Sequence, residues 1–191
     1  VDVRFTDPRG KMQHLSQHVD TISEETLEEG FMFDGSSIAG WKAINESDML
    51  LKPDLYRAYM DPFFAQPTLA LFCDVLEPSS GQPYSRDPRS TAKAAIAHMA
   101  STGVADTAFF GPEAEFFLFE DVKMDVSMNR GYYEVDSSEG PYNSAKNYDE
   151  GNLGHRPGIK GGYFPVPPVD SGQDVRSEML SVMADMGVPV E

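Results

Sequence analysis

The sequence predicts an α+β fold in which strands surround a short helix at the start of the chain. Three observations predict it. Residues 1–7 and 11–15 alternate apolar and polar side chains around a Pro-Arg-Gly turn, which is typical of a hairpin. The motif Thr-Ile-Ser-Glu at 21–24 resembles a capping box and begins a short acidic helix that ends at Gly30. Residues 68–76 form a nearly continuous apolar run, which is typical of a buried strand.

A segment rich in turn-forming residues, 77–84, predicts a domain boundary. It divides the chain into a small domain, 1–84, and the beginning of a larger α+β domain, 85–191. The first residues already alternate as a strand does, and the last five, 187–191, are an apolar run where another strand should begin. We therefore expect the sequence to be incomplete at both ends, with the larger domain truncated.

The second domain should begin with a helix, because Asp87 suits the N-cap position and Pro88 the first helical position. Residues 105–120 predict a strand. Residues 121–162 are rich in Gly, Asn, Ser, Tyr and charges with little periodicity, so they are interpreted as long functional loops. A final helix is predicted over 171–186, with a stripe of Val and Met side chains that is typical of a surface facing the core.

Composition narrows the class of protein. The 191 residues are 40% hydrophobic, which is enough for a packed core, and the net charge is −16. That charge repels phosphate backbones and anionic lipid surfaces, so nucleic acid and membranes are poor partners. Apolar runs fall short of the ~20 residues that span a bilayer, so the cytoplasm is the expected location. The lone cysteine, Cys73, is interpreted as a small buried hydrophobic residue.

Two carboxylates stand two apart in the apolar segment Phe110 to Phe119. In a strand, residues i and i+2 point to the same face with Cα atoms roughly 6.7 Å apart, so Glu113 and Glu115 would project together. Burying an unpaired carboxylate is costly, and divalent cations that prefer oxygen, Mg²⁺ or Mn²⁺, would explain the pair. The alternative is an amphipathic strand whose polar face is simply in water. The local residues leave both open.

A second motif, Phe33-Asp34-Gly35-Ser36-Ser37, has the composition of a turn. Together with Glu46-Ser47-Asp48 it resembles the amino-terminal signature of glutamine synthetase. Two further segments resemble parts of the same family: 111–116 its metal-binding strand, and 154–170 the loop and strand entry of a bacterial class I member. The resemblance covers all 191 residues. It implies a β-grasp-like small domain, followed by the first part of a catalytic domain with an antiparallel sheet.

The resemblance also implies an activity and a set of site residues. The family joins ammonia to glutamate with ATP through γ-glutamyl phosphate. By this match, Asp34 binds ammonium and removes its proton; the alternative is that Asp34 only caps a turn. The remaining implied site residues are Ser37, Asp48 and Tyr163 near ammonium, Trp41 and Glu191 near the nucleotide, and Glu113 and Glu115 on two divalent ions.

The family resemblance further implies a homo-oligomer, a dodecamer of two six-membered rings, whose active sites are shared between subunits. The part beyond residue 191 should hold the remaining metal ligands. Two other functions remain open. One is a related γ-glutamyl ligase for a bulkier amine, against which an intact Asp34 argues. The other is a non-catalytic assembly or regulatory protein of the same family.

Overall fold

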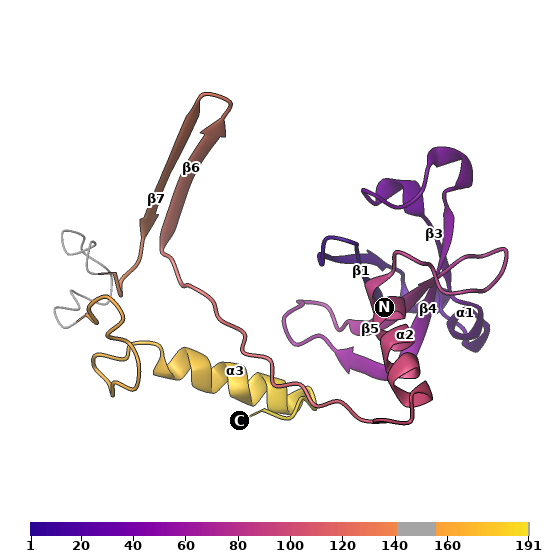
Figure 1. The fold of residues 1–191 in the computed structure, drawn as a ribbon. Coiled ribbons are helices and arrows are strands. Elements are labelled where there is room, and N and C mark those ends of the chain that lie inside the picture. The colour runs from indigo at the N-terminus through magenta and orange to yellow at the C-terminus, as the bar shows by residue number, and fades with distance from the viewer. Residues whose placement is uncertain (141–155, 191) are drawn as a thin grey trace. The chain divides into compact units, whose positions relative to one another are not determined.

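The computed structural model describes residues 1–140 and 156–190. Two compact units divide at residue 110, one spanning Val1–Phe110 and the other Gly111–Glu191 (Figure 1). Helix α2, Pro88–Ser101, therefore belongs to the first compact unit. The predicted domain division after residue 84 stays a prediction, because a division into compact units does not define where one domain of the family ends and the next begins.

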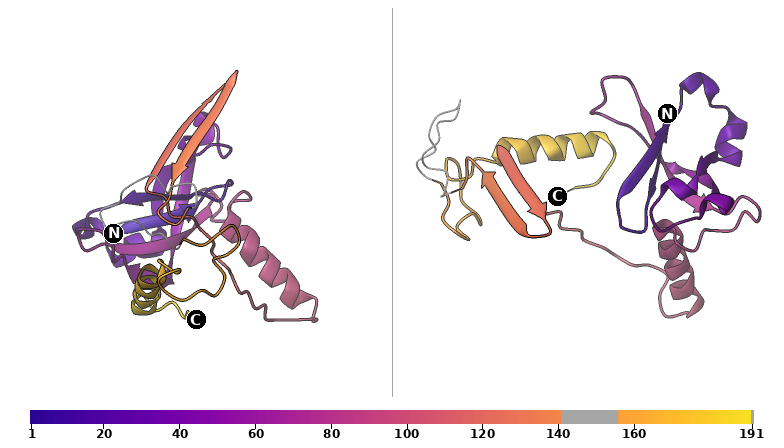
Figure 2. Two further views of the ribbon diagram at one scale, coloured as in Figure 1. Left: turned by 90° about the vertical axis from the view of Figure 1, so that its left-hand side faces the viewer. Right: turned by 90° about the horizontal axis from the view of Figure 1, so that it is seen from above.

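The first unit is built on a five-stranded mixed sheet in the order β2-β1-β5-β4-β3. Only β1 and β5 pair in parallel; the other neighbours are antiparallel. Helix α1, Glu24–Glu29, contacts β4, and α2 contacts β5. Figure 2 shows the same elements from two further directions. The strands are β1 Asp2–Thr6, β2 Met12–Ser16, β3 Phe31–Asp34, β4 Asp48–Met60 and β5 Leu69–Leu76.

The predicted amino-terminal hairpin is confirmed as β1 and β2. The short acidic helix is confirmed too, but its capping box was placed two residues too early. Ser23 is the N-cap: its Oγ accepts the Thr26 amide at 3.1 Å, and Thr26 Oγ1 accepts the Ser23 amide at 3.3 Å. Thr21 instead ends a short 3-10 turn, Val19–Thr21. Gly30 ends the helix at φ 96°, a conformation that glycine adopts without strain.

The core of the first unit lies on one face of the sheet and is closed by aromatic side chains from the loops. Cys73 is fully buried, as predicted. Strand β4 is 13 residues long, and its register with β5 shifts between Pro53 and Ala58. Proline has no amide hydrogen for the ladder, which explains an irregularity beginning there. The buried core residues are Val3, Phe5, Phe31, Trp41, Met49, Leu51, Cys73, Val75 and Tyr84.

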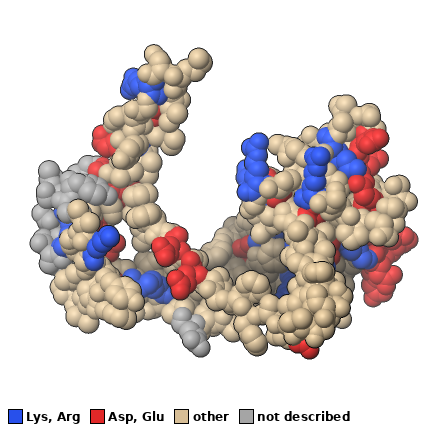
Figure 3. Space-filling view, viewed as in Figure 1, with Lys and Arg blue, Asp and Glu red and all other residues tan. Residues whose placement is uncertain are grey.

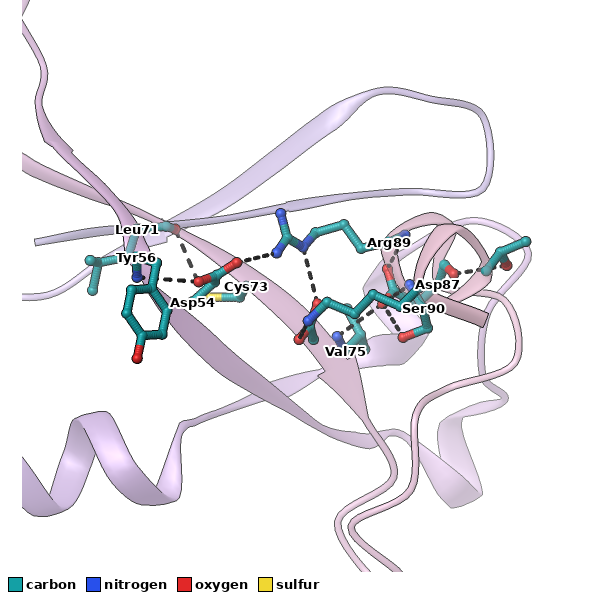
Figure 4. A network of polar contacts seen from close by, with 11 residues as sticks. Asp54, Tyr56, Leu71, Cys73, Val75, Asp87, Arg89 and Ser90 are labelled. Atoms are coloured by element: carbon teal, nitrogen blue, oxygen red, sulfur yellow. Dashed lines mark hydrogen bonds and ion pairs between the residues drawn. The ribbon is translucent and has the colours of Figure 1, made fainter. Parts of the chain in front are cut away.

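Polar contacts connect α2 to the sheet (Figure 4). Asp87 is the N-cap, as predicted, and its Oδ2 accepts the Ser90 amide at 3.0 Å and the Val75 amide at 3.3 Å. Arg89 donates to Asp74 on β5 at 3.0 Å and to Asp54 on β4 at 2.7 Å. Burial opposes the charge of Arg89, but the hydrogen bonds to the two carboxylates outweigh it and raise its pKa. The start of α2 is therefore bound to the sheet by buried and half-buried groups.

The second unit contains a two-stranded antiparallel hairpin, β6 Asp121–Ser127 and β7 Arg130–Asp136, and helix α3, Gln173–Asp185. The helix was predicted to within two residues. The strand predicted over 105–120 was wrong for residues 105–119, which have no strand partner in the described structure. The interpretation of 121–162 as loops was also wrong for the hairpin, and residues 141–155 of that range lie outside the described structure.

A physical reason accounts for both errors. A strand is defined by a hydrogen-bonded neighbour, and a local apolar pattern does not reveal whether the neighbour is present. In the hairpin, Val122, Met124 and Val126 do alternate with polar residues. This strand pattern is short and lies in a sequence otherwise rich in polar residues, so it was not recognised as a strand. Helix α3 has no buried residue among those the structure describes, so its Val and Met stripe is not a core surface there. No helix in the described ranges is long and apolar enough to cross a bilayer.

Candidate functional site

Asp34 ends strand β3 and caps the 3-10 turn η2, Gly35–Ser37. Its Oδ1 accepts two hydrogen bonds from Ser36, from the amide at 2.8 Å and from the hydroxyl at 2.6 Å. The hydrogen bond from the Ser36 hydroxyl, and next the one from the Ser36 amide, lower the pKa of Asp34. The Ser47 hydroxyl adds a smaller effect in the same direction, and together these groups outweigh burial, which raises the pKa. The turn-capping geometry is thus present, on a carboxylate that is exposed and ionised at neutral pH.

The pairing of β3 with β4 places Asp48 directly opposite Asp34. The preceding residue, Ser47, accepts the Gly35 amide through its carbonyl oxygen at 2.6 Å. Gly35 is buried, and a Cβ at this position would lie 2.5 Å from the Met49 side chain. The turn therefore packs tightly on the start of β4, and the structure brings Asp34 and Asp48 together with Ser37 exposed on the same turn.

An open groove of about 860 Å³ lies beside this turn, between 3-10 turn η3, Ile44–Glu46, and the segment after β5. Lys42 lines it and donates to both carboxylate oxygens of Glu77, at 2.7 and 2.9 Å. Glu77 raises the pKa of Lys42 by this contact. Asp48 also lines the groove, so a predicted site residue faces a space that a ligand can enter.

Trp41 is only 6% exposed and belongs to the core. Its ring lies 5.5 Å from that of Phe5 and 5.4 Å from that of Tyr84. Its indole Nε1 is buried and has no hydrogen-bond partner within the part of the chain that the structure describes. Trp41 therefore fixes the end of the Asp34 loop to the core, and its predicted nucleotide contact stays a prediction.

Glu113 and Glu115 lie in the second unit, and both are exposed. Further along the same segment the rings of Phe117 and Phe119 stack at 5.9 Å, which is the side-by-side arrangement expected of residues two apart in an extended chain. Within residues 1–140 and 156–190, no group of three or more His, Cys, Asp or Glu side chains is assembled to hold a metal ion. Two carboxylates of hard oxygen character fit Mg²⁺ or Mn²⁺ but fill only part of its coordination shell.

Glu115 also lines a groove of about 660 Å³ within the second unit. The groove is shared with residues that follow β7, with Gly158 and Gly162, and with Arg176 at the start of α3. Tyr163 follows directly and is exposed, with its ring 4.4 Å from that of Phe164. Glu191 lies outside the described residues, as do the first two residues of the 154–170 segment.

Acidic side chains gather at one edge of the first unit, where α1 carries four glutamates (Figure 3). They are not part of the grooves. This distribution agrees with the negative charge expected to disfavour nucleic-acid backbones.

Comparison with known proteins identifies the family. Residues 1–78 match the model of the glutamine synthetase β-grasp domain, and residues 85–191 match that of the glutamine synthetase catalytic domain. The chain belongs to the glutamine synthetase family. Over its full length it is 70% identical to glutamine synthetase of Azospirillum brasilense and 62% identical to that of Methylococcus capsulatus, and it spans 41% of the length of each.

A solved structure of glutamine synthetase from Plasmodium falciparum matches the whole chain and 37% of that protein, with a TM-score of 0.82 and 23% identity. This likeness concerns the fold. The α+β prediction, with a β-grasp domain at the amino terminus, is confirmed by the fold and the family match.

Sequence reasoning gave no role to Ser36 and Ser47, although both stand in the motifs that it used. The signal was available in part. A serine two residues after an aspartate is the spacing of a side chain that caps its own turn. The contact of Ser47 depends on strand register, which the sequence did not define.

Proposed function

We propose that a full-length protein containing this chain ligates ammonia to the γ-carboxylate of glutamate with ATP, forming glutamine through γ-glutamyl phosphate. The observation that carries the proposal is an intact, exposed Asp34, held by its own turn, in a chain 70% identical to a glutamine synthetase. A γ-glutamyl ligase for a bulkier amine would have little use for an acid that binds ammonium. A non-catalytic relative would have no need to keep Asp34 with Glu113 and Glu115.

Asp34 is proposed to handle the amine substrate. In neutral solution the available species is ammonium, which has no lone pair for attack. An ionised carboxylate first attracts the cation and then accepts its proton, which releases ammonia at the reacting carbon. The lowered pKa of Asp34 keeps it ionised for the first step. Ser37, Asp48 and Tyr163 are proposed to complete the ammonium site.

Glu113 and Glu115 are proposed to hold divalent cations, Mg²⁺ or Mn²⁺, with further ligands from outside the described residues. When bound, such cations neutralise charge on the phosphates of ATP during phosphoryl transfer. Trp41 and Glu191 are proposed to lie near the nucleotide. Changing Glu113 or Glu115 to Gln should weaken Mn²⁺ binding at distinguishable sites, whereas Glu178→Gln on exposed α3 should not. An affinity unchanged within about twofold in both site variants would refute the metal assignment.

The active protein is proposed to be a cytoplasmic homo-oligomer, a dodecamer by family resemblance, with sites shared between subunits. The Asp34 turn would then serve a neighbour's metal site. Mixing an excess of full-length Glu113→Gln with Asp34→Asn should restore partial activity, because some interfaces pair an intact turn with intact metal ligands. Absence of recovery, with subunit mixing demonstrated by mass, would place both residues in the site of one chain.

The proposed reaction is tested by phosphate release from ATP in the presence of glutamate and an amine. The full-length protein should turn over with ammonium and form glutamine, and methylamine should be a much poorer substrate. A preference for methylamine would support the alternative ligase, and no turnover with any amine would support the non-catalytic role. The isolated 191-residue chain should be inactive, because it spans only 41% of the length of the curated relatives.

A further inference from the structure

Ser36 donates more hydrogen bonds to the Asp34 carboxylate than any other described residue. Both of its donors, the amide and the hydroxyl, reach the same oxygen, Oδ1, at 2.8 and 2.6 Å. The shorter contact is typical of a hydroxyl donating to a charged oxygen. Ser37, the other serine of the motif, makes no such contact with Asp34 among the described residues.

The groups around Asp34 leave little freedom to its side chain. A carboxylate offers roughly four acceptor positions, and Ser36 occupies two of them on one oxygen. The hydroxyl of Ser47, the residue before β4, makes a smaller contribution to the lowered pKa of this carboxylate. The acceptor positions that Ser36 does not occupy are left for a substrate cation, on a carboxylate that Ser36 holds by one oxygen.

Two charged residues also lie near this turn. Asp48 is the register partner of Asp34, and its repulsion is screened because both carboxylates are exposed to water. Lys42 passes near the turn, with its Cγ 3.6 Å from where a Gly35 side chain would begin, but its ammonium is held by Glu77. Neither residue replaces the hydrogen bonds from Ser36.

We propose that Ser36 is a positioning residue for ammonium use, whose hydroxyl fixes the orientation of the Asp34 carboxylate toward the substrate cation. The inference rests on the proposed role of Asp34 in the ligase reaction. Ser36 itself does not touch the substrate. It acts through Asp34, so removing its hydroxyl should affect the ammonium step and leave the ATP step nearly unchanged.

The test uses the full-length protein with Ser36→Ala. The KM for ammonium should rise roughly three- to tenfold, which is the scale of one lost hydrogen bond to a charged group in contact with water. The KM for ATP should change by less than about twofold. Without the hydroxyl donor the pKa of Asp34 rises, so the acid limb of kcat/KM for ammonium should move to higher pH. Ser36→Thr keeps the hydroxyl and should restore both properties.

Two controls separate positioning from a general effect. Ser80→Ala removes a hydroxyl that accepts the Gln82 amide in another exposed turn, and it should leave the ammonium KM unchanged. In an Asp34→Asn background, Ser36→Ala should have less than half its effect, because a positioning residue acts only through its target.

The outcomes distinguish this inference from the proposed function. If Asp34→Asn leaves the ammonium KM unchanged, the role of Asp34 is refuted. If Asp34→Asn impairs ammonium use while Ser36→Ala behaves as wild type, only the role of Ser36 is refuted. An equal rise in the KM for ATP and ammonium in Ser36→Ala would show a disturbed loop and would also overturn the positioning role.

Discussion

The N-cap of α2 offers a sharp test of how the first unit is held together. Asp87 is fully buried, and its carboxylate accepts amides from the helix and from β5 at the same time (Figure 4). Asp87→Ala removes the cap of the helix, which costs about 0.5–2 kcal/mol. It also leaves the buried Val75 amide without this acceptor, at about 1–3 kcal/mol. We therefore expect a loss of about 2–4 kcal/mol in the free energy of unfolding.

The assay is urea unfolding of a polypeptide of residues 1–110, the first compact unit, followed by circular dichroism. With an m-value of about 2 kcal/mol/M, in the middle of the range for small proteins in urea, the midpoint should fall by roughly 1–2 M. Ser23→Ala removes the exposed cap of α1 and serves as the matched control, with an expected loss of about 1 kcal/mol. Asp87→Ser keeps a helix cap, but its side chain is too short to reach the Val75 amide. Its loss in the free energy of unfolding should therefore lie between those of Ser23→Ala and Asp87→Ala. If Asp87→Ala costs no more than Ser23→Ala, the buried link between α2 and β5 does not stabilise the unit.

Three further outcomes are expected of the same structure. Burial raises the pKa of the Cys73 thiol to about 12, so the thiol should not react with a disulfide reagent at pH 8 until the protein unfolds. Rapid reaction of the folded protein would contradict the burial of Cys73. Burial opposes ionisation of Asp2, but hydrogen bonds from Arg4, His14 and Ser16 outweigh it and lower the pKa of Asp2. The resulting stabilisation is present above the unfolded pKa of about 3.9 and is lost as pH falls through the folded value. In a pH series of urea midpoints, Asp2→Asn should lose less stability in acid than the wild type, and an unchanged slope would contradict this. Gly35→Ala should destabilise the first unit by about 1–3 kcal/mol, because its Cβ would lie 2.5 Å from the Met49 side chain. An unchanged urea midpoint would refute the close packing.

Local patterns predicted the elements whose causes are local. The hairpin of β1 and β2, the cap at Asp87 and the end of α1 at Gly30 all depend on residues a few positions apart. The misplaced capping box illustrates the limit. Thr21 and Ser23 both suit an N-cap, and the choice between them depends on where the chain turns.

Non-local partners explain what the sequence did not predict. The segment containing Glu113 has the composition of a strand but no neighbour among the described residues, whereas the hairpin of β6 and β7 supplies its own neighbour. The opposition of Asp34 and Asp48 depends on the register of β3 and β4. The family motif named both residues, but only the register shows how they meet.

In the proposed reaction, Asp34 serves the ammonium step and Glu113 serves phosphoryl transfer. Positional isotope exchange in ATP tests this directly, because reversible formation of γ-glutamyl phosphate scrambles oxygen-18 between the bridging and non-bridging positions of the β-phosphate. With glutamate but no ammonium, full-length Asp34→Asn should retain this exchange, and Glu113→Gln should lose it. Loss of exchange in Asp34→Asn, or its retention in Glu113→Gln, would contradict this assignment of roles to the two residues.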